Sequence, residues 1–163
     1  DMTDGDITRI RLKNWERGQR TRLVESLMAE GTKHLKSQSY SPKKAVEKFT
    51  EVIQYDETNV DAYVFRSYAY VQQVGPTSPG PAITRIYLPL LEAALSDAKK
   101  AVGLAPENAD AAHHLRIALV RLGKLTSNDE LVRQAEEARL RAAKLGYYDV
   151  FYKSIFDRYD IKH

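Results

Sequence analysis

Apolar residues along most of this chain recur at spacings of three and four, with charged residues between them. In one typical stretch, Ala45, Phe49 and Val52 fall on one side of a helix, while Lys44 and Glu47 fall on another. This period predicts amphipathic helices, and the alternation expected of strands is almost absent, so the predicted class is all-α. The predicted helices cover residues 7–18 merging into 20–37, then 42–55, 59–73, 82–102, 108–122, 129–145 and 149–159.

Three stretches of this pattern align with one another as a two-helix unit. The first contains Leu27, Glu30, Gly31, His34, Ala45, Phe49 and Val52. The second contains Tyr63, Arg66, Ser67, Tyr70, Ala94, Ala98 and Ala101. The third contains Ala112, Leu115, Arg116, Leu119, Ala135, Arg139 and Ala142. Repeated helix pairs predict a stacked array that buries a continuous core.

The aligned units resemble the tetratricopeptide repeat (TPR) family, whose unit is about 34 residues long. Gly31 and Ser67 stand where that family places a small residue between paired helices, and Pro106-Glu107-Asn108 matches its Pro-x-Asn ending. The resemblance implies three antiparallel helix pairs stacked as a short right-handed superhelix with a concave face. It also implies a domain division: a basic extension over 1–23, repeats over 24–59, 60–108 and 109–147, and a capping helix over 148–163.

The chain departs from the family pattern between its paired helices. The longest departure is a proline-rich insertion over residues 74–89, where Pro89 is expected to kink or restart the following helix. The third unit carries Arg116 in place of the small contact residue. Gly123 and Gly146 stand where helix C-caps are expected.

The first helix of each pair lines the concave groove in this family, so the repeat register predicts a binding face. This face is apolar and aromatic with one basic end, and it suits a helix or extended peptide of a partner protein. Its predicted members are Met28, Thr32 and Lys36 from the first pair, Val64, Phe65, Tyr68 and Gln72 from the second, and His113, His114, Ile117 and Arg121 from the third. The alternative is that a segment of the chain itself fills the groove.

One branch of the family holds the C-terminal carboxylate of the chaperones Hsp70 or Hsp90 with lysine, asparagine and arginine side chains. A carboxylate needs such a cluster of charge-assisted donors. The matching positions here carry Met28, Thr32, Phe65, Asp110 and His114. We therefore expect this chain not to act as a carboxylate clamp.

Charge is concentrated near the N-terminus. Six cations and one glutamate over residues 7–23 give a local net charge of +5, within a chain of net charge +3. One interpretation is a solvated helix that leads into the first repeat, with Trp15 packed against that repeat. The other is an arm that binds nucleic acid or an anionic membrane.

Residues that could carry other chemistry are few. The chain has no cysteine, so disulfides and thiolate metal sites are excluded. The adjacent His113 and His114 point about 100° apart on a helix and cannot chelate one metal from one face. Phosphate-binding glycine motifs are absent. We expect neither an enzyme nor a cofactor-binding protein.

The C-terminal segment carries Phe151, Ile155 and Tyr159 at helical spacing. This stripe predicts a helix that caps the open end of the array, or alternatively a surface for self-association. The chain begins with Asp1 and shows no signal-peptide pattern, so we expect an excerpt of a longer cytoplasmic or nuclear protein.

Overall fold

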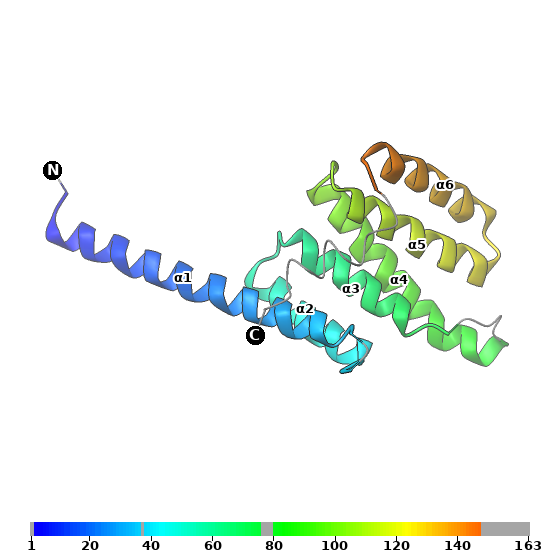
Figure 1. Ribbon diagram of the computed structural model, residues 1–163, viewed down its shortest axis with the longest axis horizontal. Coiled ribbons are helices and arrows are strands. Elements are labelled where there is room, and N and C mark those ends of the chain that lie inside the picture. Colours follow the sequence, from blue (N-terminus) through cyan, green and yellow to red (C-terminus); the bar gives the residue numbers. More distant parts are fainter. Residues whose placement is uncertain (1, 37, 76–79, 148–163) are drawn as a thin grey trace.

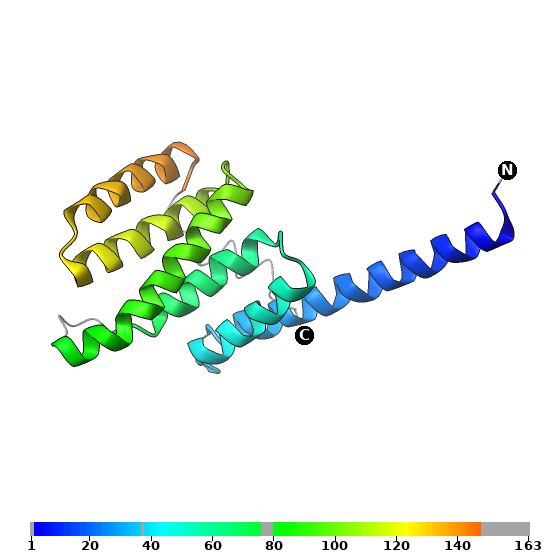
Figure 2. The same ribbon diagram turned by 180° about the vertical axis from the view of Figure 1, so that it is seen from behind.

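The computed structural model describes residues 2–36, 38–75 and 80–147, which form six α-helices and no strand. The helices are α1 (Asp4–Lys33), α2 (Pro42–Tyr55), α3 (Val60–Gln72), α4 (Pro81–Leu104), α5 (Ala109–Thr126) and α6 (Asp129–Lys144). Antiparallel pairs α1–α2, α3–α4 and α5–α6 stack side by side, and α2 and α4 each also pack on the first helix of the next pair (Figures 1 and 2). The predicted all-α repeat architecture is confirmed.

Asparagine side chains set the start of three helices. Asn59 and Asn108 accept a hydrogen bond from the backbone N–H of Ala62 and Ala111, and Asn128 caps α6 in the same way. Each cap satisfies a backbone donor that the first turn of a helix leaves open. The helix predicted to begin after Ser41 does begin at Pro42, although the Ser41 side chain makes no capping hydrogen bond.

The helix pairs pack closely because small residues line the second helix of each pair. Ala45, Ala94 and Ala135 are all at most 2% exposed, and so are Ala101 and Ala142. A methyl side chain lets helix backbones approach without loss of contact. Two clusters of buried side chains result. One is centred on α1, α2 and α3 and also includes Ala101 and Ala111, and the other is centred on α4, α5 and α6 and also includes Val71.

Only the C-terminal part of α1 packs against the other helices. It continues without a break through residue 23, and its N-terminal part projects away from the stack (Figure 1). Leu27 is its first buried residue. Trp15 is 62% exposed, so the prediction that it packs against the first repeat was wrong. The reason is distance, because Trp15 lies about 18 Å before Leu27 along the helix axis.

Helix α4 contains Pro89 in its interior and runs as one element from Pro81 to Leu104. The helix therefore does not restart at Pro89, which was one of the two outcomes predicted for this residue; a kink there stays a prediction. Proline removes the hydrogen bond to the carbonyl four residues earlier, which here belongs to Arg85. Both Arg85 and Pro89 are exposed, so the missing hydrogen bond lies on the solvent-exposed side of α4.

Gly123 is inside α5 rather than at its end, which also corrects the prediction. Helix α5 continues to Thr126, and Ser127 takes the left-handed cap conformation at φ 51°. A Cβ atom on Gly123 would lie 2.9 Å from Cγ2 of Val132, so glycine is needed where α5 and α6 touch. Gly146 follows α6 with φ 85°, as expected of a glycine after a helix C-terminus.

The predicted C-terminal helix over residues 149–159, with its capping and self-association roles, lies outside the described residues. Among the helices that the structure describes, none combines the length and hydropathy needed to cross a bilayer.

Candidate functional site

The predicted binding face is carried by α1, α3 and α5, and its residues divide into two groups. Met28, Thr32, Val64, Phe65, His113 and His114 are buried. Lys36, Tyr68, Gln72, Ile117 and Arg121 are partly exposed. Helices α3 and α5, which carry four of these partly exposed residues, are in direct contact.

The buried group contributes to the core. The rings of Phe49 and Phe65 stack with their centroids 5.4 Å apart. Gly31 makes room for this stack, because a Cβ atom there would lie 2.5 Å from Cε1 of Phe49. Met28 belongs to the same buried cluster. Substituting Phe65 therefore changes the free energy of unfolding, whatever it does to binding.

Aromatic side chains connect α3, α5 and the segment after α6. The Tyr68 ring meets the edge of the His114 ring at 5.7 Å, and His113 stacks on Tyr147 at 3.9 Å. Sequence reasoning did not assign Tyr147 to this face. Its position directly after Gly146, where the chain turns back at the end of α6, was the available signal.

Burial makes His114 a neutral side chain. Burial is the main cause that lowers the pKa of His114 from 6.5 to about 3, and the neighbouring His113 and Arg116 contribute to the same shift. The imidazole therefore carries no charge near neutral pH. His114 contributes aromatic surface and does not supply a cation for an anionic ligand.

Polar side chains mark one end of the face. The Tyr40 hydroxyl donates to Oε1 of Gln72 at 3.1 Å, which ties the loop between α1 and α2 to α3. Nη2 of Arg121 donates to the carbonyl oxygen of Val74 at 3.4 Å. These bonds hold Gln72 and Arg121 in place at the C-terminal ends of α3 and α5.

A buried ion pair supports α3 from the opposite side, and sequence reasoning missed it. Nε and Nη2 of Arg66 each donate to one carboxylate oxygen of Asp97 at 2.7 Å, and Nη1 donates to Thr50 at 3.1 Å. Burial raises the pKa of Asp97, and the Arg66 guanidinium opposes that rise. The pair joins α2, α3 and α4 with fixed geometry.

Metal chemistry finds no support within the described ranges, since no three His, Asp or Glu side chains there come together as a metal site. His34 lies at the C-terminus of α1, with its Nδ1 3.3 Å from the carbonyl oxygen of Ser39. His34 is partly exposed.

No protein-family model matches the sequence, and no curated protein matches it either. One similar solved structure is described as the second TPR of Spaghetti (RPAP3) bound to the HSP90 peptide SRMEEVD. It superposes with a TM-score of 0.61 at 21% sequence identity, covering 83% of this chain and 96% of that one. Together with the three stacked helix pairs, this similarity identifies the fold of the chain as that of a tetratricopeptide repeat domain.

Proposed function

We propose that this chain is a protein-interaction module, an adaptor or scaffold, that holds a peptide or helix of a partner protein on the face formed by α1, α3 and α5. The observation that carries the proposal is the surface where α3 and α5 meet. Tyr68 and Gln72 on one helix and Ile117 and Arg121 on the other are partly exposed there.

The chemistry of this surface suits a ligand with apolar anchors and a few hydrogen bonds. Tyr68 and Ile117 provide apolar area, and such anchors carry most of the binding energy in peptide grooves. Gln72 and Arg121 provide polar groups at one end, while Lys36 provides a cation on the α1 side. The buried residues Met28, Val64 and Phe65 keep the helices in place beneath these contacts.

The similar structure supports a peptide ligand, since that TPR domain is described with a peptide bound. Its peptide SRMEEVD is a direct probe of the carboxylate clamp. We expect this chain to bind SRMEEVD only weakly, because His114 is neutral and Met28, Thr32 and Phe65 offer no cation. Fluorescence anisotropy with the labelled peptide measures this directly, and submicromolar binding would contradict it.

The binding face itself is tested without a known partner. A phage library of random peptides is panned against the immobilised chain, and enriched peptides are measured against Ile117→Ala, Tyr68→Ala and Ile86→Ala. Ile86 is 64% exposed on α4, so its variant makes the same change as Ile117→Ala on another surface. We expect about a tenfold or larger loss with the two variants of the face and none with the control. Equal affinities for all three variants would refute the assignment.

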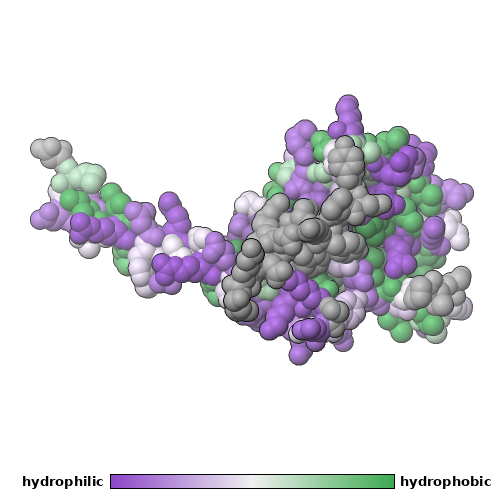
Figure 3. Space-filling model, in the orientation of Figure 1, coloured by the Kyte–Doolittle hydropathy of each residue, from purple (hydrophilic) through white to green (hydrophobic). Residues whose placement is uncertain are grey.

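A second function is favoured by the exposure of the projecting part of α1. Arg9, Arg11, Lys13, Arg17, Arg20 and Arg22 are all exposed there. Hydrophilic and apolar areas alternate along this part of the helix (Figure 3). Ile10 and Leu12 lie about 160° apart around the helix, so no single apolar face exists for insertion into a membrane. We propose contact with the phosphates of a nucleic acid.

Salt dependence tests this second function. Arg17→Gln/Arg20→Gln/Arg22→Gln should weaken binding to a labelled single-stranded RNA. The slope of log affinity against log salt should fall by about 2, since each phosphate contact on a single strand contributes about 0.7. If the chain does not bind RNA, or if the triple variant binds RNA as well as the wild type does, the projecting part of α1 is not a nucleic-acid-binding site.

A further inference from the structure

The repeats supply an internal comparison on the side of the stack away from the proposed binding face. Two junctions exist there: the first junction is α3 between α2 and α4, and the second junction is α5 between α4 and α6. Asn59 and Asn108 cap α3 and α5 identically, and Arg66 and Leu115 lie at the same distance along the helix from these caps. The two residues are therefore structural equivalents.

The second helices extend this equivalence. The buried alanines Ala45, Ala94 and Ala135 mark one register position on α2, α4 and α6. Counted from these alanines, Thr50 on α2 corresponds to Lys99 on α4. In the same way, Asp97 on α4 corresponds to Ala138 on α6. The three polar partners Thr50, Arg66 and Asp97 of the first junction thus become Lys99, Leu115 and Ala138 in the second.

The first junction is spanned by a polar bridge. Arg66 reaches Asp97 on α4 and Thr50 on α2, and the Tyr63 ring lies beneath its guanidinium at 5.8 Å. A hollow of about 590 Å³ remains beside this bridge, with Tyr63 and Arg66 on its wall. Long side chains therefore occupy much of the space between the outer helices α2 and α4.

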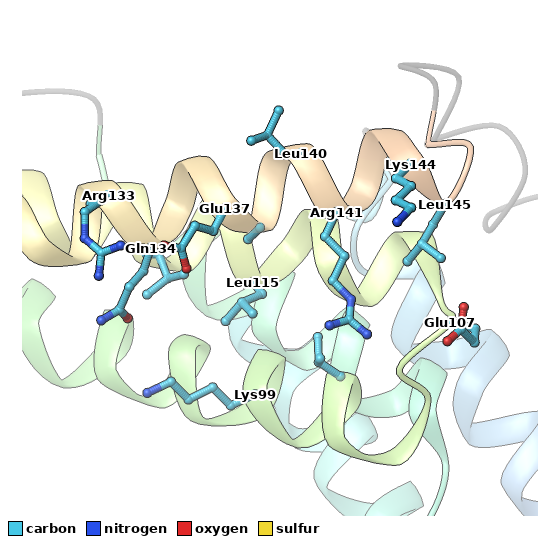
Figure 4. Close-up of a pocket in the computed structure, with 13 residues that line it drawn as sticks. Lys99, Glu107, Leu115, Arg133, Gln134, Glu137, Leu140, Arg141, Lys144 and Leu145 are labelled. Carbon is cyan, nitrogen blue, oxygen red and sulfur yellow. Dashed lines mark hydrogen bonds and ion pairs between the residues drawn. The ribbon is translucent and has the colours of Figure 1, made fainter.

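The second junction has no such bridge. Leu115 and Ala138 are too short to cross it, and a hollow of about 1030 Å³ lies between α4 and α6 above α5 (Figure 4). Leu115 and Val102, which are partly exposed, provide an apolar floor above the buried Leu119. An uncovered apolar floor of this kind, bordered by polar side chains, is typical of an interaction surface.

The border of this hollow is positively charged. Four cations and two glutamates line it, namely Lys99, Arg133, Arg141, Lys144, Glu107 and Glu137. Arg133 is held by Glu130 and Glu137, and Arg141 donates to the carbonyl oxygen of Pro106. Lys99 and Lys144 form no ion pair with any described residue. Figure 4 shows their amino groups on opposite sides of the hollow.

The walls determine the conformation of an occupant. Backbone groups in the middle of α4 and α6 are already bonded within their own helices, so an extended peptide would find few partners for its backbone. A helix brings its backbone hydrogen bonds with it. On α6 the lining runs from Arg133 to Lys144, about 17 Å, which matches about three helical turns.

We propose that the hollow between α4 and α6 is a second docking site, which takes an acidic amphipathic helix of a partner protein. Apolar side chains of that helix pack on Leu115 and Val102, and its carboxylates pair with Lys99 and Lys144. The site lies on the other side of α5 from the proposed peptide-binding face. Its existence does not depend on the function proposed for that face.

Two synthetic helical peptides of about four turns test the charge requirement. Both carry leucine at positions i, i+3, i+4 and i+7, and the remaining positions are mainly glutamate in one and lysine in the other. Fluorescence anisotropy should show the acidic peptide binding at least about tenfold more tightly than the basic one. Equal affinities, or an acidic peptide bound more weakly than about 1 mM, would overturn the proposal.

Variants then locate the binding. Leu115→Arg/Ala138→Asp copies the bridge of the first junction into the second and should abolish binding of the acidic peptide. Lys99→Glu/Lys144→Glu changes only surface charge and should reverse the preference between the peptides. Circular dichroism and thermal unfolding confirm that each variant folds. Tyr68→Ala should leave the affinity unchanged, and loss of binding in that variant would place the peptide on the other face instead.

Discussion

The first and second junctions share their order of helices and their asparagine caps, and they differ in what lies between the outer helices. In the first, Arg66 joins Asp97 on α4 to Thr50 on α2. In the second, Leu115 and Ala138 occupy the equivalent positions and leave a hollow with a basic border. The backbone arrangement therefore does not depend on the bridge. Asparagine caps and buried alanines fix the stack, while the side chains between outer helices are free to change.

The largest expected effect comes from breaking the bridge on one side. Arg66→Leu leaves the carboxylate of Asp97, which is 5% exposed, without its cation. A buried charge that has lost its partner costs about 3–5 kcal/mol. Denaturant unfolding should show this loss in the single variant.

The matched control is Arg66→Leu/Asp97→Ala, which gives the first junction the residues of the second. This double variant should recover most of the lost free energy of unfolding, because no uncompensated charge remains. A double variant as unstable as Arg66→Leu would contradict the claim that the stack does not depend on the bridge.

The next effect concerns the point where α5 and α6 touch. Gly123→Ala places a methyl group 2.9 Å from Cγ2 of Val132 and 3.1 Å from the carbonyl oxygen of Asn128. Overpacking of this kind costs about 1–3 kcal/mol. Gly103→Ala is the control, because a Cβ atom there meets nothing within 4 Å. It should stabilise helix α4 by about 0.5–1 kcal/mol, and similar effects at both glycines would be inconsistent with this packing.

An effect that grows as the pH falls tests whether His114, on the inner side of the second junction, is buried as a neutral ring. The pKa of His114 is about 3 in the folded chain against 6.5 in the unfolded chain, so the unfolded chain binds a proton first as pH falls. The free energy of unfolding should therefore decrease between pH 6.5 and pH 3, by about 1.4 kcal/mol per pH unit once the unfolded residue is protonated. Denaturant unfolding at a series of pH values should show a shallower decrease in His114→Gln. Equal slopes would mean that His114 is not buried as a neutral ring.

The smallest effects concern what the two junctions share. Asn59→Ala and Asn108→Ala each remove one capping hydrogen bond to the backbone N–H three residues later. Each should cost about 1 kcal/mol in thermal or denaturant unfolding. The two costs should agree closely, and a large difference between them would show that the caps are not equivalent.

Much of the fold was predictable because it rests on local patterns. The period of the apolar residues, Pro42 at a helix start and Gly146 at a helix end gave the helices and their pairing correctly. The local rule was overridden at Pro89, where the helix does not restart, and at Gly123. Pro89 lies on the exposed side of α4 and the helix continues through it, while Gly123 serves a tertiary contact with Val132 rather than a helix end.

The candidate site was harder to predict because register does not reveal burial. Phe65 and Tyr68 both follow from the repeat alignment, yet Phe65 stacks on Phe49 in the core while Tyr68 is partly exposed. The Arg66–Asp97 pair joins residues that are far apart in sequence, so no periodic pattern predicts this ion pair. Trp15 is too far along α1 from Leu27, the first buried residue of that helix, to contact the first repeat.

The most direct test of the account is an amide NMR titration of the chain with a peptide selected by panning. If partners bind on the face formed by α1, α3 and α5, the largest shift changes will fall at Tyr68, Gln72, Ile117 and Arg121. Shifts confined to α2, or to α4 and α6 around Lys99 and Lys144, would contradict the assignment of that face as the main binding surface.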